Sequence, residues 1–141
     1  MLGIGLLPFA SKAVAPELTE YRGHAVWLDF WASWCGPCRQ SFPWMQRLQQ
    51  RYAAQGLIVV AVNLDHQKKD ADRFLTGFAH DFTVRFDSAI ALASELNVKT
   101  MPTSFLLDSA GNVVATHVGF KPSDEYRYEA EVERLLGSPH P

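Results

Sequence analysis

Hydrophobic and polar residues follow one another along the chain in blocks that predict strands and amphipathic helices in alternation. Residues 25–30 (AVWLDF) and 57–64 (LIVVAVNL) are apolar enough to form central strands that are buried on both faces. Between them, apolar residues three or four positions apart predict a helix that runs to about Gln55 and has one buried face: Phe42, Met45, Leu48 and Tyr52. Pro43 inside this helix predicts a kink. This alternation is typical of an α/β domain.

The middle of the chain continues the pattern. A helix over residues 70–79, a short strand over 83–86 and a second helix over 89–96 are predicted there. The first of these helices has an apolar face: Phe74, Leu75 and Phe78.

The C-terminal third predicts a β-hairpin and a last helix. Strands over 104–107 and 113–118 flank a turn at 108–112 (DSAGN), so they would add antiparallel strands to an otherwise parallel sheet. Ser123 is predicted to cap the final helix at its start, and Gly137 to end it. Its apolar face consists of Tyr128, Val132, Leu135 and Leu136.

Composition places the chain among single-domain globular proteins. Its 141 residues are 48% hydrophobic and 20% charged, with a net charge of −2. A chain of this length buries roughly 70% of its unfolded surface, so it needs no disulfide for its stability. The Lys and Arg residues are scattered, without the positive stripe that binding to phosphate backbones requires, so nucleic acid is not expected as a partner.

The N-terminal segment 1–24 is expected to precede a domain that spans residues 25–141. Residues 1–10 are apolar but shorter than the ~20 residues that cross a bilayer. Two interpretations remain open. The run is the remnant of a signal peptide with a small-residue cleavage site at 13–15 (AVA), although it lacks a basic region, or it is an apolar edge segment of the mature domain.

The two cysteines, Cys35 and Cys38, stand three positions apart where a strand and a tight turn lead into a helix. The first turn of a helix has unpaired N–H groups and the positive end of the helix dipole, which stabilise a thiolate and lower its pKa from ~8.5. Cys35 is therefore predicted to be the exposed nucleophile. Cys38, one turn further, is predicted to be more buried and to resolve a mixed disulfide.

A zinc site or an inert buried pair is the alternative role for the cysteines. Tetrahedral zinc would need two further ligands. The five histidines have no paired spacing: His24, His66, His80, His117 and His140. A redox pair is favoured over a metal site, and no metal is expected.

Residues 29–39 (DFWASWCGPCR) resemble the thioredoxin signature. Pro43, five positions after Cys38, resembles the kink proline of thioredoxins, and residues 101–103 (MPT) resemble their cis-proline loop. The resemblance implies a thioredoxin fold, a central mixed β-sheet flanked by helices, from about residue 25 onward.

Residues 66–86 are extra relative to plain thioredoxin and follow residues 62–65 (VNLD). This inserted helix and strand resemble those of TlpA- and ResA-like proteins, which are mostly exported or membrane-tethered bacterial reductases, some serving cytochrome c maturation. The resemblance implies a periplasmic or other extracytoplasmic setting, protein disulfide substrates and an electron-donating reductase that could be membrane-bound. A monomer without a cofactor is expected.

Asp29 matches the buried aspartate of thioredoxin, whose accompanying lysine is replaced here by Val62. Without that cation, burial should raise the pKa of Asp29, and the carboxyl could then accept the proton of Cys38 as a general base. The alternative is a solvated strand residue, which the apolar run around Asp29 disfavours.

The resemblance also places a substrate surface beside Cys35. Pro102 is expected in the cis form, with the backbone of Met101 pairing with an extended substrate segment. Gly36 and Pro37 adjoin Cys35, and Trp34 is either part of this docking surface or a core residue. The other tryptophans are expected in the core: Trp27, Trp31 and Trp44.

The predicted function is thiol:disulfide exchange with protein substrates. The Gly-Pro pair between the cysteines resembles thioredoxin, whose potential is about −270 mV, which favours a reductant. Two alternatives remain. One is a non-catalytic binding module or chaperone, against which the intact dithiol argues, and the other is a thiol peroxidase, whose Pro-x-x-x-Thr-x-x-Cys setting is absent here.

Overall fold

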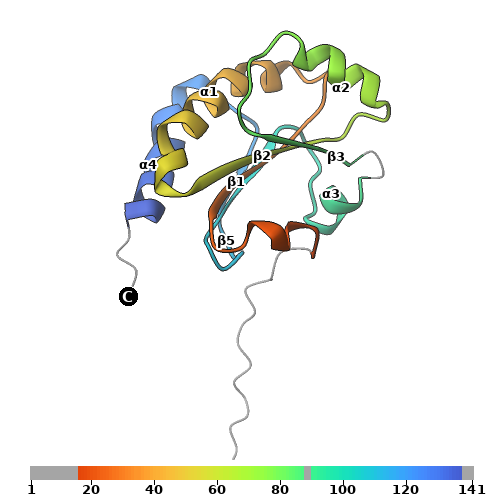
Figure 1. Ribbon diagram of the computed structural model, residues 1–141. Helices are drawn as coiled ribbons and strands as arrows, with labels where there is room; N and C mark the ends of the chain where they lie inside the picture. Colours follow the sequence, from red (N-terminus) through yellow and green to blue (C-terminus); the bar gives the residue numbers. More distant parts are fainter. Residues whose placement is uncertain (1–15, 88–89, 138–141) are drawn as a thin grey trace, which may run out of the picture.

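The computed structural model describes residues 16–87 and 90–137, which form a five-stranded sheet covered by helices (Figure 1). The strand order is β3-β2-β1-β4-β5. β1 pairs in parallel with β2, which pairs in parallel with β3, whereas β4 and β5 are antiparallel to their neighbours. The mixed sheet predicted from the sequence is confirmed. The strands are β1 (Ala25–Trp31), β2 (Leu57–Asn63), β3 (Thr83–Phe86), β4 (Thr103–Leu107) and β5 (Val113–Val118).

The helices lie on both faces of the sheet. α1, α2 and α4 contribute to the core on one face, and α3 with η1, a 3-10 helix, contributes to the core on the other (Figure 1). The helical elements are η1 (Pro16–Tyr21), α1 (Gly36–Tyr52), η2 (Ala53–Gln55), α2 (Lys68–Leu75), α3 (Ala91–Glu95), η3 (Pro122–Asp124) and α4 (Glu125–Gly137).

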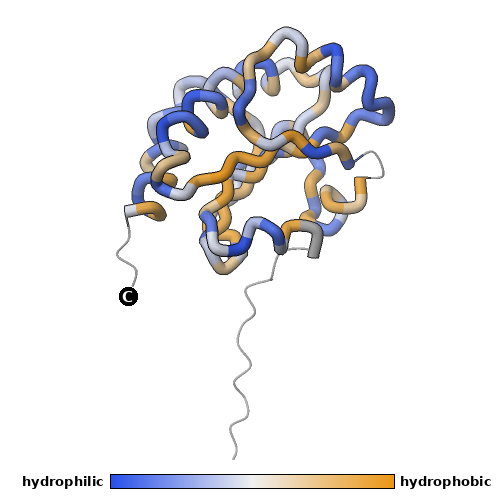
Figure 2. Tube along the Cα trace, in the orientation of Figure 1, coloured by the Kyte–Doolittle hydropathy of each residue, from blue (hydrophilic) through white to orange (hydrophobic). Residues whose placement is uncertain are grey.

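The central strand β1 divides the core in two, because successive side chains of a strand point to opposite faces. All seven of its residues are buried. Trp27 and Trp31 belong to the cluster under α1, α2 and α4, whereas Leu28 and Phe30 belong to the cluster under η1 and α3. Figure 2 shows the hydrophobic segments gathered along the sheet and the hydrophilic ones on the outer helices. Asp29 falls by this alternation on the face of Trp27 and Trp31.

An aromatic cluster joins the inserted segment to the rest of the domain. Phe42 of α1 is fully buried, and its ring centroid lies 4.7 Å from that of Trp31 and 5.0 Å from that of Phe74 on α2. Phe78 and Phe82 complete the cluster, at 5.6 and 5.3 Å from Phe42. The insertion therefore packs as part of the main core on the face that carries the cysteines.

The two helices in the middle of the chain have other bounds than predicted, and α2 already begins at Lys68 rather than at residue 70. α2 ends at Leu75 rather than at residue 79, because Thr76 closes its last turn and Gly77 follows, so Phe78 packs on the core from beyond the helix. α3 begins at Ala91, because the carboxylate of Asp87 accepts the first N–H groups of that helix, including those of Ala91 and Leu92. The predicted start of this helix at residue 89 lies outside the described residues.

The predicted N-cap role of Ser123 is wrong. Pro122 has a fixed φ that suits the first turn of a helix, and it opens the 3-10 turn η3, in which Ser123 lies. α4 then begins at Glu125 and is described as far as Gly137; its predicted end at that residue stays a prediction, because the following residues lie outside the described ones. Helix α1 continues through Pro43. The kink predicted at this proline stays a prediction.

The N-terminal part of the described chain packs against the sheet. Leu18 and Tyr21 of η1 are buried in the cluster with Leu28 and Phe30. The two interpretations of residues 1–10, and the cleavage site at 13–15, lie outside the described residues. Across residues 16–87 and 90–137, no helix combines the length and hydropathy that crossing a bilayer requires.

Candidate active site

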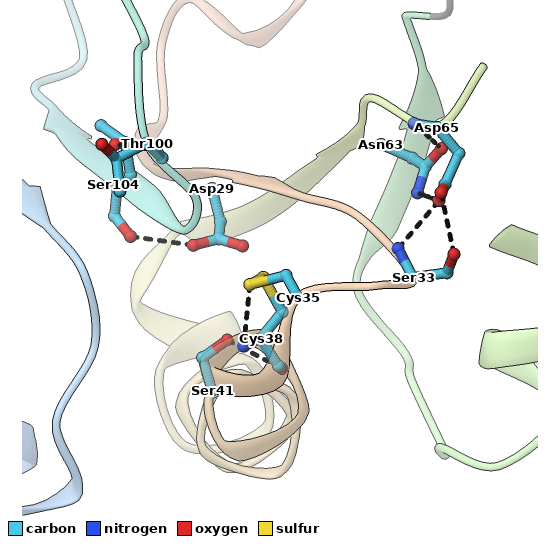
Figure 3. Close-up of a disulfide and its surroundings, with 10 residues drawn as sticks. Asp29, Ser33, Cys35, Cys38, Ser41, Asn63, Asp65, Thr100 and Ser104 are labelled. Atoms are coloured by element: carbon cyan, nitrogen blue, oxygen red, sulfur yellow. Dashed lines mark hydrogen bonds between the residues drawn. A yellow bond between two sulfur atoms is a disulfide. The ribbon is translucent and has the colours of Figure 1, made fainter.

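Cys35 and Cys38 form a disulfide at the N-terminus of α1 (Figure 3). Cys35 is the N-cap residue, with extended backbone angles (φ −91°, ψ 114°), and its Sγ accepts the backbone N–H of Cys38 at 3.3 Å. Pro37 occupies the first turn, where a missing N–H costs nothing. The predicted position is confirmed: a free amide of the first helical turn points at the sulfur of Cys35, where it would stabilise a thiolate.

The burial of the two cysteines differs in part from the prediction. Cys38 is fully buried, as expected, but Cys35 is only 4% exposed, so the expectation of an exposed nucleophile is wrong for this disulfide form. Both cysteines pack within the apolar cluster under α1. The surface at this point is formed by the neighbours Trp34, Gly36 and Pro37, which are exposed.

Asp29 lies in the core on the sheet face that carries the disulfide (Figure 3). It is 1% exposed, and burial raises its pKa to about 7, an effect opposed by a hydrogen bond from Ser104. Ser104 Oγ donates to Asp29 Oδ1 at 2.9 Å, while Asp29 Oδ2 has no hydrogen-bond partner among the described residues. The predicted burial and the predicted rise in pKa are both confirmed.

The residue beside Asp29 on β2 is Ala61, not Val62. The parallel register pairs Asp29 with Ala61 and Phe30 with Val62. Val62 therefore lies on the opposite face of the sheet, in the cluster with Leu28 and Phe30. The prediction that Val62 replaces the lysine beside Asp29 is wrong by one position. A shift of one position along a strand moves a side chain to the other face of the sheet. The neighbour is nevertheless uncharged, so the reason for the raised pKa holds.

A buried carboxylate fixes the loop that precedes the cysteines, and sequence reasoning missed it. Asp65 Oδ2 accepts the backbone N–H of Ser33 at 2.9 Å, and Oδ1 accepts the Ser33 hydroxyl at 2.8 Å. Asn63 donates its side-chain amide to Asp65 Oδ2 at 2.7 Å and accepts the Asp65 N–H at 2.9 Å (Figure 3). The end of β2 therefore holds the loop between β1 and Cys35.

The loop before β4 is the second wall of the site. The Met101–Pro102 peptide bond is cis, as predicted. Pro102 precedes Thr103, which pairs with Phe30 close to the end of β1, and Met101 packs against the cluster that contains both cysteines. The structure thus brings the two sequence motifs, separated by more than 60 residues, to the same end of the sheet.

The tryptophans divide between core and surface. The side chain of Trp34 is 71% exposed, so its alternative as a core residue is excluded. The other three are buried, as predicted: Trp27, Trp31 and Trp44. An exposed indole beside the disulfide leaves an apolar contact surface next to the reactive pair.

The part of the chain that the structure describes gathers no group of three or more His, Cys, Asp or Glu side chains able to hold a metal ion. His117, one of the candidate histidines, instead contacts Glu131 of α4, with 2.8 Å between Nε2 and Oε1. His80 Nδ1 lies 3.0 Å from the carbonyl oxygen of Phe78.

The sheet order, with a C-x-x-C disulfide opening α1 and a cis-proline loop beside it, defines the thioredoxin-like class of proteins. The chain belongs to the Redoxin family, whose model matches residues 10–136. The relatives of this chain confirm the resemblance to ResA-like proteins that the inserted segment indicates.

Two curated relatives and one solved structure illustrate the similarity. The thiol-disulfide oxidoreductase ResA of Geobacillus thermodenitrificans is 32% identical over 82% of this chain, which spans 66% of that relative's length. The thioredoxin-like protein YneN of Bacillus subtilis is 34% identical, with 89% of this chain and 76% of the relative covered. A crystal structure from Chlorobium tepidum, described as a thiol:disulfide interchange protein DsbE, is 51% identical with a TM-score of 0.84, covering 85% of each chain.

Replacing Asp29 by Asn should change how stability depends on pH. The carboxyl has a pKa of about 7 in the folded protein and an ordinary value of 3.8, so folding is favoured by its bound proton at low pH, and that contribution is lost as pH rises through 7. Asn cannot ionise. The stability of Asp29→Asn relative to the wild type should therefore increase by roughly 2–3 kcal/mol from pH 5 to pH 8.

Urea unfolding of the oxidised proteins at both pH values measures this change. Asp72→Asn is the matched surface control, because Asp72 is exposed on α2, where it pairs with Lys68, and the change in Asp29→Asn is measured against it. Stability curves for wild type and Asp29→Asn that stay parallel between pH 5 and 8 would contradict the assigned pKa.

Replacing Asp65 by Asn should loosen the loop before Cys35. An amide offers one acceptor oxygen where the carboxylate offers two, so bonds to Ser33 or Asn63 are lost and a buried donor is left unpaired. We expect the free energy of unfolding to fall by about 2–3 kcal/mol, measured by urea at pH 7. Ser33→Ala removes only the hydroxyl bond and should cost about 1 kcal/mol. An equal or smaller loss for Asp65→Asn would show that the carboxylate is not needed.

Proposed function

We propose that this protein is a thiol:disulfide oxidoreductase that reduces protein disulfides through Cys35 and Cys38. The observation that carries the proposal is the disulfide at the start of α1, with the amide of Cys38 directed at the sulfur of Cys35. The names of the relatives, thiol-disulfide oxidoreductase and thiol:disulfide interchange protein, support the same activity.

The reaction begins with the reduced protein. The thiolate of Cys35 attacks one sulfur of a substrate disulfide, and the bond between the two substrate sulfurs breaks with its electron pair on the departing thiolate. Cys38 then gives its proton to Asp29, and its thiolate attacks Cys35 Sγ in the mixed disulfide. The second substrate sulfur leaves as a thiolate. Two electrons have passed to the substrate, and the Cys35–Cys38 disulfide has formed.

The surroundings of the cysteines suit a protein substrate. Trp34, Gly36 and Pro37 are exposed beside the disulfide, and Met101 is partly exposed before the cis-proline. A segment lying in extended form across Met101 could pair with its backbone, while the indole of Trp34 covers an apolar side chain. In this proposal Pro102 shapes the loop that receives the segment.

The direction of electron transfer, the electron donor and the cellular location of the protein are inferred from its resemblance to ResA- and TlpA-like proteins. The Gly-Pro pair between the cysteines favours a reductant. We infer that the protein works outside the cytoplasm as a monomer, receives electrons from a thiol-disulfide reductase that could be membrane-bound, and contributes to thiol homeostasis or cytochrome c maturation.

Two other functions would give different results in simple assays. A binding module or chaperone would not change the rate at which dithiothreitol reduces insulin disulfides, whereas the proposed enzyme accelerates that reduction. A thiol peroxidase would consume hydrogen peroxide, which the proposed enzyme should not do at a significant rate.

The order of attack provides the direct test of the proposal. Cys35 lies at the helix start with an amide directed at its sulfur, whereas Cys38 is fully buried, so substrate should enter through Cys35. Cys38→Ser should still attack a substrate disulfide but cannot resolve the product. A mixed disulfide should therefore accumulate and be visible on non-reducing electrophoresis.

Cys35→Ser is the matched control and should trap little substrate. If Cys35→Ser traps more than Cys38→Ser, and alkylation of the reduced wild type is faster at Cys38, the two roles are reversed and the proposal fails in this form. The Cys38→Ser trap, used in the source cell, would also recover the natural partner.

A further inference from the structure

Ser104 is a buried polar residue within β4, whose five residues are all buried. It is 5% exposed, and its hydroxyl donates to Asp29 Oδ1 at 2.9 Å. A buried hydroxyl without a partner would destabilise the fold, so this bond offsets the cost of a serine at that position. Neither the sequence motifs nor the mechanism above gives Ser104 a role.

The bond is set by the backbone of the sheet. The antiparallel register places Ser104 directly opposite Asp29, although the two residues are 75 positions apart in the chain. Directly opposed residues of two strands project to the same face, at a separation of about 5 Å. Because serine is short, the strand and one side-chain torsion fix the position of its oxygen. The hydrogen bond from that hydroxyl in turn fixes the plane of the Asp29 carboxyl group.

The consequence is an unequal pair of carboxyl oxygens. Oδ1 accepts the hydroxyl of Ser104, whereas Oδ2 is buried without a partner among the described residues. When Asp29 takes up a proton, binding at Oδ2 disturbs no existing bond and leaves Oδ1 as the carbonyl oxygen, the better acceptor for the Ser104 hydroxyl. In Figure 3 the carboxyl group lies between Ser104 and the disulfide.

We propose that Ser104 is a positioning residue for the resolving step: its bond to Oδ1 holds the Asp29 carboxyl so that Oδ2 receives the proton of Cys38. The inference rests on the proposed role of Asp29 as the base. In that step the S–H bond of Cys38 breaks, the proton binds Oδ2, and the Cys38 thiolate attacks Cys35 Sγ as the substrate thiolate leaves.

The electrostatics of the pocket agree with this role. Burial raises the pKa of Asp29, and the Ser104 bond opposes that rise, leaving a value of about 7. Ala61 is the uncharged neighbour on β2, and Figure 3 shows the disulfide at the start of α1 next to the Asp29 carboxyl group. On the other side of β4, His117 of β5 pairs with Ser104, and it contacts Glu131 of α4. Ser104 is therefore the residue on the strands beside Asp29 that favours the ionised carboxyl.

The test measures the Asp29 carboxyl itself, in the oxidised protein, where the cysteines do not titrate. Carbon-13 NMR of the aspartate side chains follows the titration, and the signal that disappears in Asp29→Asn identifies the residue. Ser104→Ala should move the midpoint upward by about one pH unit, since it leaves burial unopposed. Ser104→Thr keeps a hydroxyl and should restore the wild-type midpoint.

Ser41→Ala provides a matched loss of a buried hydroxyl near the same disulfide. Ser41 Oγ donates to the carbonyl oxygen of Cys38 at 3.1 Å and has no bond to Asp29, so the midpoint of Asp29 should stay unchanged. An unchanged midpoint in Ser104→Ala, or an equal shift in Ser41→Ala, overturns the inference.

A second readout separates this inference from the role of Asp29. Stopped-flow release of the substrate thiol from a Cys35 mixed disulfide gives the resolution rate against pH. In Ser104→Ala the rise of this rate should move to higher pH by the same amount as the carboxyl midpoint, and in the Asp29→Asn background Ser104→Ala should have no further effect. If the carboxyl midpoint moves while the rate profile does not, the bond tunes Asp29 but Asp29 is not the base, and the proton-transfer role is overturned.

Discussion

The register between β1 and β4 is the constraint on which the site depends. It sets Asp29 opposite Ser104 and Phe30 opposite Thr103, so the loop with the cis-proline reaches the end of β1 from which the C-x-x-C segment departs. A slip of one residue would turn Asp29 to the opposite face of the sheet and separate it from both Ser104 and the cysteines. The apolar residues of β1 resist that slip, because Trp27 and Trp31 fill one core and Leu28 and Phe30 fill the other.

The site is a polar exception on an otherwise apolar sheet face. Asp29 is enclosed by the cluster that contains the disulfide, and burial there gives its carboxyl a pKa near neutrality. At the ends of the strands, Asp65 holds Ser33, and the cysteines begin α1. The chemistry therefore uses a carboxylate whose burial opposes its ionisation. One hydrogen bond holds this carboxylate, whereas several hydrogen bonds hold the neighbouring loop before the cysteines.

Local patterns made the fold and the cysteine pair predictable from the sequence, whereas long-range contacts did not. Hydrophobic runs located the strands to within one residue, and the motif around Cys35 located the start of α1. Ser104 and Asp65 act through partners 75 and 32 positions away, and no sequence pattern reports such a bond. The assignment of Val62 failed for the same reason, since the face of a strand residue depends on the register with its neighbour. Ser123 failed because Pro122 began the turn before it.

A protein that reduces disulfides requires a dithiol that gives up electrons readily. The reduction potential of the Cys35–Cys38 couple tests that requirement most directly, by equilibrating the protein in glutathione or dithiothreitol redox buffers and separating the two forms after alkylation. The Cys35–Cys38 couple should have a potential close to that of thioredoxin, about −270 mV. A potential near that of the strong oxidant DsbA, about −120 mV, would contradict it and make the protein a donor of disulfides.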